Sequence, residues 1–138
     1  FFSQAITVEE AQEEAKFVLD KIAPYKISCP VVLDVEKVSD SEARMNKITA
    51  QERTANTIAF LEAIEAAGYK SMLYHNMEMG TLMLDLPQLE KYEKWFAYYN
   101  KEIYYPYEFC VWQYTDKGKV SGINGAVDMN ISFHLWDD

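Results

Sequence analysis

The segment Cys29-Pro30-Val31-Val32-Leu33-Asp34-Val35-Glu36 decides the fold that we expect for this chain. Its run of apolar and β-branched residues is typical of a buried strand. Side chains alternate between the two faces of a strand, so Asp34 and Glu36 share one face with Val32. Val31, Leu33 and Val35 point to the other face. The sequence therefore places two acids side by side at the carboxyl end of a strand.

Two acids at the end of an apolar strand require an explanation, because burying a carboxylate costs several kcal/mol or forces its protonation. In parallel sheets, open or closed, ligands bind beyond the carboxyl ends of the strands, where Asp34 and Glu36 would lie. The alternative is that both acids leave the sheet and meet solvent as the next loop begins. The strand alone leaves both interpretations open.

The composition is that of a single soluble globular domain. The chain has 138 residues, 49% hydrophobic residues and a formal net charge of −9. Nucleic-acid binding needs clustered Lys and Arg, so the acidic balance argues against it. No apolar stretch approaches the roughly 18 residues of a membrane span. The aromatic content of 14% suits a sugar-binding cleft, but aromatic residues also fill cores.

The cysteines and histidines do not form a recognisable metal or nucleophile motif. Cys29 and Cys110 are far apart, and no CxxC motif or His cluster accompanies them, so we expect buried free thiols. His75 and His134 are isolated, and we expect them in loops or exposed. We expect no cofactor and no metal.

Helix signals alternate with strands early in the chain. Capping boxes at Thr7-Val8-Glu9-Glu10 and Thr49-Ala50-Gln51-Glu52 each begin a helix, which ends before Pro24 and Gly68 respectively. Further strands are predicted over 69–74, 94–99, 109–114, 120–123 and 127–130, with short helical segments over 77–84 and 86–92. The βα alternation thus decays into a run of strands. No boundary divides residues 1–138, which we treat as one domain.

Several motifs in a fixed order resemble glycoside hydrolase family 25, the Chalaropsis-type lysozymes or muramidases. They are Tyr25-Lys26, the segment 30–36, Ala67-Gly68-Tyr69, Met72-Leu73-Tyr74-His75-Asn76, Trp112-Gln113-Tyr114 and Gly125-Ala126-Val127-Asp128-Met129-Asn130. Each motif is weak alone. Their order over nearly the whole chain makes chance an implausible explanation.

The resemblance implies an α/β fold, an irregular (β/α)5β3 TIM-like barrel of which this chain holds only the C-terminal two thirds. The family's first strand, with an Asp-x-Ser motif, has no counterpart here. The 138 residues would then be a partial catalytic domain whose barrel is completed by an N-terminal segment or a second copy. Because an incomplete barrel exposes sheet edges, we expect the lone monomer to be unstable.

The resemblance also implies a site and a substrate. Glu36 would be the proton donor, Asp34 its partner, and Asp128 the late acid of the family's Val-Asp-x-Asn motif. The substrate would be peptidoglycan, cut after N-acetylmuramic acid, with the substrate's own N-acetyl group as nucleophile. Strand spacing by itself does not choose between inversion and retention. The protein would act outside the cell or at the cell wall, as a secreted bacterial enzyme or a phage endolysin.

Aromatic and amide side chains near the strand ends are candidates for binding sugars. These are Tyr74, Asn76, Trp112, Gln113, Tyr114 and Asn130. Trp112 and Tyr114 share a strand face opposite to Gln113. Core filling remains an equal interpretation for Trp112 and the favoured one for Trp95, and loop capping remains one for both asparagines.

Two other functions compete with the muramidase. A carbohydrate-binding module without catalysis would keep the fold and the aromatic cleft but lack an essential acid. A chitinase would carry Asp-x-x-Asp-x-Asp-x-Glu, but Pro30 and Val32 stand at the positions six and four residues before Glu36. The chitinase motif is therefore absent.

Overall fold

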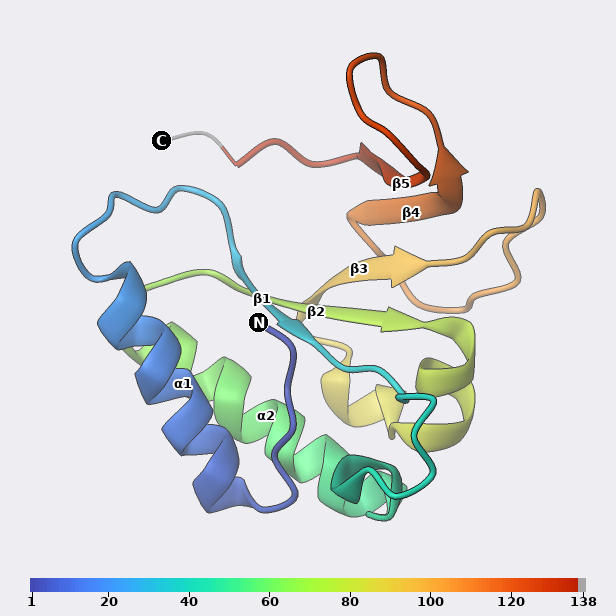
Figure 1. Ribbon diagram of the computed structural model, residues 1–138. Helices are drawn as coiled ribbons and strands as arrows, with labels where there is room; N and C mark the ends of the chain where they lie inside the picture. The colour runs from blue at the N-terminus through green and yellow to red at the C-terminus, as the bar shows by residue number, and fades with distance from the viewer. Residues whose placement is uncertain (137–138) are drawn as a thin grey trace.

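Residues 1–136 are described by the structure, a computed structural model, and they form one curled sheet with helices on one of its faces (Figure 1). The five-stranded sheet has the order β1-β2-β3-β4-β5, in which the first four strands are parallel and β5 is antiparallel to β4. The strands are β1 (Val31–Asp34), β2 (Ser71–Asn76), β3 (Glu93–Ala97), β4 (Val111–Gly118) and β5 (Val127–Ser132).

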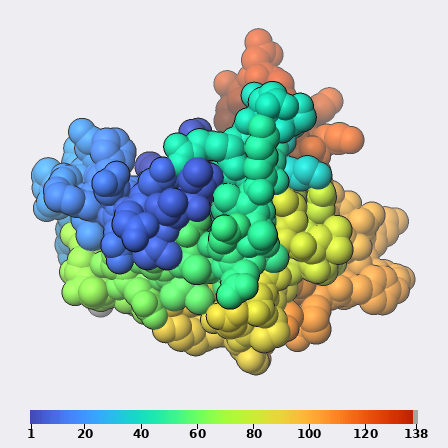
Figure 2. All heavy atoms as spheres, turned by 90° about the horizontal axis from the view of Figure 1, so that it is seen from below, coloured from blue at the N-terminus to red at the C-terminus, as the bar shows by residue number. Residues whose placement is uncertain are grey.

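Two long helices, α1 (Val8–Ile22) and α2 (Ala50–Ala66), lie together on one side of the sheet. Figure 2, which views that side, shows α1 in blue close to the green atoms of α2. Both begin where the sequence predicts, because Thr7 and Thr49 accept hydrogen bonds from the backbone N–H groups of Glu10 and Glu52. The capping box is complete only at Thr49, where the Glu52 side chain accepts from the Thr49 N–H. In the first helix the Glu10 side chain accepts from the Ile6 N–H instead.

The main core forms between these helices and the sheet. Leu33 of β1 is 1% exposed, Phe60 of α2 is fully buried, and Ala15 of α1 packs in the same apolar cluster. Burial alternates along β1 as predicted, so the face that carries Asp34 points away from the helices. Three short helical segments complete the described elements: η1 (Arg44–Asn46), η2 (Met79–Met83) and η3 (Leu86–Leu89).

The sheet curls through β4 and β5, which rise away from β1 and β2 in Figure 1. The pairing of β4 with β5 shifts register between Gln113 and Thr115 and again before Gly118. Such irregularities increase local twist and bend a strand. At the opposite edge, Phe2 forms a parallel bridge with Asp34 and extends the sheet by a short segment. The result is a half-barrel whose concave face carries the acids.

The prediction of a strand over 120–123 is wrong. The Ile123 N–H donates to the Val120 carbonyl in a turn, and Gly122 and Gly125 have φ values of +89° and +108°. Those backbone angles favour glycine and suit the connection between β4 and β5. Residues 120–123 are therefore part of a loop, and the predicted strand over 127–130 lies within β5.

Two predictions about burial are also wrong. Both thiols are free, but Cys29 is exposed and Cys110 is only partly buried. His75 is fully buried, because it follows Leu73 by two residues and so shares the core face of β2. Its Nδ1 and Nε2 atoms lie 2.9 Å from the Asn76 carbonyl oxygen and the Tyr105 hydroxyl. His134 is exposed, as expected.

Burial lowers the pKa of His75 from 6.5 to about 4, which predicts a pH dependence of stability. Between those values the unfolded chain binds a proton that the folded chain does not, so stability falls as pH drops through this range. The full contribution is about 3 kcal/mol. Urea unfolding measures the free energy of unfolding of the protein and of His75→Phe from pH 7 to 4. Over this range the value for the protein should fall by about this amount relative to that of the variant. Parallel stability profiles would contradict the prediction.

None of the helices in residues 1–136 combines the length and apolar character that crossing a membrane requires.

Candidate functional site

The candidate site begins with Asp34 and Glu36 at the carboxyl end of β1. Asp34 is the last residue of the strand, Glu36 lies two residues beyond it, and both side chains are half-buried. Burial, followed by the charge of Glu36, raises the pKa of Asp34 from 3.8 to about 6. Two carboxyl groups that repel each other in a partly desolvated place do not both ionise easily near neutral pH.

Asp128 joins this pair from the far strand of the sheet. It lies on β5 and is exposed, and its charge contributes, after burial, to raising the pKa of Glu36. The curl of the half-barrel accounts for this approach, because a flat sheet would keep β5 four strands away from β1. Asp34, Glu36 and Asp128 therefore form one electrostatically coupled group, which we call the acid cluster.

A hydrogen-bonded group of polar side chains lines the concave face next to the acid cluster. Tyr74 of β2 and Tyr99 both donate to the Oε1 atom of Gln113, at 2.9 and 2.5 Å. Burial raises the pKa of Glu36, the neighbouring Tyr74 hydroxyl lowers it, and the charge of Asp128 raises it. Burial raises the pKa of Tyr74 further above its ordinary value, so its hydroxyl stays protonated.

Trp95 lies on the same face, although the sequence favours core filling for it. Its ring is half-buried and packs edge-on against Tyr74, with 5.3 Å between centroids. Its indole N–H donates to Asn130 Oδ1 at 2.8 Å. Sequence reasoning missed Trp95 and Tyr99. Trp95 is placed by the sheet register, because it pairs with Tyr74, which pairs with Asp34.

Three predicted sugar-binding residues make other contacts. Asn76 Oδ1 accepts from the Met79 N–H at 2.8 Å and so caps the turn into η2. Trp112 pairs with Phe96 and Phe96 with His75, so these side chains share the core face of the sheet, opposite to the acid cluster. Tyr114 lies against Trp112, with 5.8 Å between ring centroids. Trp112 is therefore on the other face from the acids, whereas Asn76 shares the concave face through its register with Ala97 and Gln113.

One oxygen of Asp34 is poised to accept a hydrogen bond. In the described part of the chain, Asp34 Oδ1 is buried and has no hydrogen-bond partner. Buried polar atoms are nearly always paired, so this oxygen is an acceptor that can take a further hydrogen bond. Among residues 1–136 no cluster of three or more His, Cys, Asp and Glu side chains is arranged to hold a metal ion.

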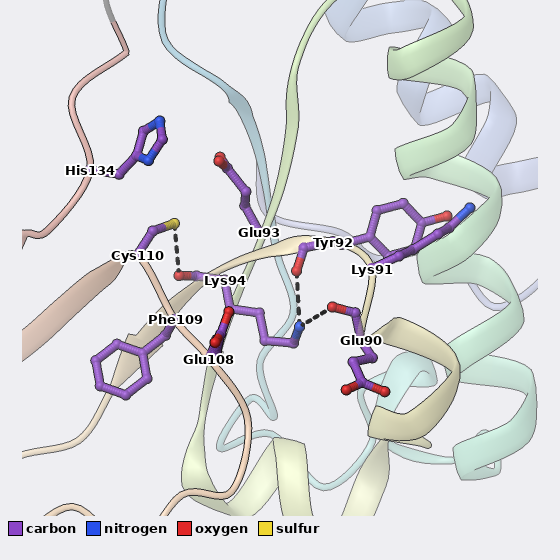
Figure 3. A pocket seen from close by; sticks show the side chains of 9 residues that line it. All are labelled: Glu90, Lys91, Tyr92, Glu93, Lys94, Glu108, Phe109, Cys110 and His134. Atoms are coloured by element: carbon purple, nitrogen blue, oxygen red, sulfur yellow. Dashed lines mark hydrogen bonds between the residues drawn. The ribbon is translucent and has the colours of Figure 1, made fainter.

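A separate pocket of about 280 Å³ lies at the opposite end of the sheet, where β3 and β4 begin (Figure 3). The buried Lys94 donates from Nζ to the carbonyl oxygens of Glu90 and Tyr92 at 3.1 and 2.9 Å. Cys110 Sγ contacts the Lys94 carbonyl. Because β1 and β3 are parallel to β2, this pocket is remote from the carboxyl ends where Asp34 lies.

Comparison with protein-family models gives a match to Glycosyl hydrolases family 25 over residues 1–123. Among curated proteins, the chain is 27% identical over 134 residues to the uncharacterized protein YegX of Escherichia coli K12. That alignment covers 95% of this chain and 45% of YegX. The chain thus spans less than half the length of the curated relatives that it matches.

Solved structures with a similar fold include two endolysins and an autolysin. The CTP1L endolysin is 29% identical with a TM-score of 0.72, covering 93% of this chain and 43% of its own. The Cpl-1 endolysin, solved with a peptidoglycan analogue, is 26% identical with a TM-score of 0.69, covering 99% and 39%. The autolysin LytC of Streptococcus pneumoniae has a TM-score of 0.80 at 23% identity, covering 94% and 32%.

Proposed function

The chain belongs to family 25 of the glycosyl hydrolases, and we propose that it is the catalytic part of a peptidoglycan hydrolase, a muramidase that cleaves after N-acetylmuramic acid. The observation that carries the proposal is the acid cluster, in which burial raises the pKa values of both Asp34 and Glu36. Glycoside hydrolysis needs one carboxyl group protonated near neutral pH and a negative group nearby.

Glu36 is the proton donor in this proposal. Its carboxyl is half-buried, and burial raises its pKa. The Tyr74 hydroxyl lowers that pKa and the charge of Asp128 raises it, so the net shift favours the protonated form. Such an acid delivers its proton to the glycosidic oxygen as the bond to the sugar breaks. The more exposed carboxylate of Asp128 supports the positive charge that develops on the sugar.

Asp34 orients the substrate's N-acetyl group. Its buried, unpaired Oδ1 is a suitable acceptor for the N–H of an acetamido group. Holding that group in place lets its carbonyl oxygen attack the anomeric carbon as Glu36 protonates the leaving oxygen. In this scheme the substrate supplies the nucleophile, and the three carboxyl groups need not meet either spacing rule for inversion or retention.

Sugar rings stack on the aromatic side chains of the concave face. Trp95 and Tyr74 present half-buried rings beside the acids, and Gln113 and Asn130 lie on the same face. Asn76 caps the turn into η2, and Trp112 lies on the core face with Tyr114 against it, so the proposal gives these three residues no sugar contact. The glycan strand therefore runs along the concave side of the sheet. The protein acts on it in the cell wall, outside the cytoplasm.

The fold proposal is that residues 1–138 form part of a (β/α)5β3 barrel whose remaining strands come from an N-terminal segment or a second copy. In the described residues, β5 pairs only with β4, and the β1 edge is covered only by the bridge at Phe2. Light scattering and thermal melting of the 138-residue chain test this. We expect association or a broad transition, whereas a monodisperse 16 kDa species with cooperative melting would refute it.

A bacterial wall suspension separates the proposed enzyme from a module that only binds carbohydrate. The muramidase lowers the turbidity of the suspension, whereas a binding module sediments with the walls and leaves the turbidity unchanged. Chitin oligomers serve as the second substrate. Their cleavage in place of wall lysis would instead indicate a chitinase-like specificity.

A further inference from the structure

The residues that follow β3 keep the alternation of that strand beyond its last residue, Ala97. The Tyr98 N–H donates to the Gln113 carbonyl oxygen of β4 at 3.0 Å, so the chain stays paired with β4 for one more step. The Tyr98 ring stacks on Phe96 on the core face, with 5.8 Å between centroids. Tyr99 therefore points to the other face, the concave one that carries the acid cluster.

Side chains of β4 also hold the segment that follows β3. Gln113 is 4% exposed, and its Oε1 atom accepts from the Tyr99 hydroxyl at 2.5 Å. From the opposite face of β4, the Trp112 indole N–H donates to the Tyr98 carbonyl oxygen at 2.8 Å. The backbone of Tyr98 and the hydroxyl of Tyr99 are therefore bonded to two consecutive residues of β4.

The Tyr99 ring stays accessible although its hydroxyl is held. Tyr99 is 48% exposed. Its hydroxyl shares the Gln113 Oε1 atom with the hydroxyl of Tyr74, which lies 2.9 Å from that atom, and Tyr74 pairs with Asp34 in the sheet. The ring thus lies on the concave face close to the acid cluster, with its polar end bonded and its apolar body open to a ligand.

We propose that Tyr99 is a further sugar-binding residue and that Gln113 and Trp112 are positioning residues that hold it in place. The ring offers a flat apolar surface to a sugar of the glycan strand, in addition to the rings of Trp95 and Tyr74. Its orientation is fixed before the glycan arrives, so binding does not have to order the side chain. This role rests on the proposed function, because that proposal supplies the glycan strand as substrate.

Tyr104 provides a comparison within the same connection between β3 and β4. It is 75% exposed, and its hydroxyl donates to the exposed Glu102 two residues before it. This hydrogen bond stays within the loop, whereas that of Tyr99 reaches a nearly buried side chain of the sheet. Tyr104 is therefore an exposed tyrosine of the same loop that is not held against the concave face.

Isothermal titration calorimetry tests the proposal with a tetrasaccharide of alternating N-acetylglucosamine and N-acetylmuramic acid. The active protein that contains this chain is used, with Glu36→Gln to prevent turnover. Tyr99→Phe keeps the ring but loses its bond to Gln113, so the Kd should rise about 3- to 10-fold, as expected when binding must order one side chain. Tyr99→Ala removes the ring as well and should raise the Kd further, whereas Tyr104→Ala should leave it unchanged. An unchanged Kd in Tyr99→Ala, or an equal rise in Tyr104→Ala, would overturn the proposal.

A double-mutant cycle separates positioning from a general disturbance of the fold. Trp112→Phe keeps an aromatic ring on the core face but loses the N–H that bonds to Tyr98. It should raise the Kd when Tyr99 is present and have no further effect in the Tyr99→Ala background, because it acts through Tyr99. An equal rise in both backgrounds would contradict the positioning role.

Steady-state kinetics with Glu36 restored give a second, independent measure. Tyr99→Phe should raise KM and leave kcat unchanged, because Tyr99 binds the glycan equally in the ground state and the transition state. A fall in kcat with an unchanged KM would contradict this.

Binding and cleavage are measured separately, so the two proposals fail differently. If the tetrasaccharide binds through Tyr99 but the protein with Glu36 releases no reducing ends from walls, the muramidase function is wrong and Tyr99 remains a sugar-binding residue. If walls are cleaved but Tyr99→Ala leaves the Kd unchanged, only the role of Tyr99 is wrong.

Discussion

Glu36→Gln is expected to abolish cleavage of peptidoglycan while leaving binding to the wall. The amide has nearly the shape of the carboxyl group, but it has no proton to give to the glycosidic oxygen. General acid catalysis contributes about 10²–10⁴-fold, and we expect a loss of that order in kcat. Release of reducing sugar ends from purified walls, in the active protein that contains this chain, measures the loss.

Glu78→Gln is the matched control for this substitution. Glu78 is an exposed glutamate that pairs with Lys37, and Lys37 is the residue that follows Glu36. Because it lies outside the acid cluster, its loss should leave the rate of reducing-end release nearly unchanged. Wall-lysing activity retained in Glu36→Gln would remove Glu36 from the acid role. Equal losses in both variants would mean that the substitutions disturb the loop after β1 and do not report on the acid.

Phe96→Ala is expected to destabilise the fold by about 3–5 kcal/mol. Phe96 is fully buried in β3 and stacks on Tyr105, with 4.2 Å between ring centroids. It also contacts the rings of His75 and Phe109, so its removal leaves a cavity among aromatic groups that cannot easily close. Urea unfolding monitored by circular dichroism gives the free energy of unfolding.

Phe17→Ala serves as the comparison. The Phe17 side chain is 52% exposed on α1, so truncating it should cost less than about 1 kcal/mol. A similar cost at both positions would mean that the aromatic cluster around Phe96 does not contribute as the structure suggests.

Local signals predicted the helices and the first acids. The capping threonines, Thr7 and Thr49, determine the helix starts through side-chain hydrogen bonds that span only three residues. The alternation from Val31 to Glu36 is equally local, and it placed Asp34 and Glu36 on one face. Patterns of this kind are readable in a sequence because the interacting atoms lie close together along the chain.

Contacts between distant strands were harder to predict. Burial of His75 depends on Tyr105 and Phe96, which lie 30 and 21 positions later in the chain. A single histidine in a strand does not predict these contacts. The sequence favours core filling for Trp95, whereas its register with Tyr74 places it on the face that carries the acids. Register depends on the whole sheet, so no local pattern in the chain determines it.

The chemical identity of the sugar ends released from purified peptidoglycan tests the central claim most directly. The acid cluster of Asp34, Glu36 and Asp128 is proposed to cut after N-acetylmuramic acid. Mass spectrometry of borohydride-reduced products should therefore find reduced N-acetylmuramic acid at the new ends, and none from Glu36→Gln. New ends of N-acetylglucosamine, or free peptides without new sugar ends, would contradict the account.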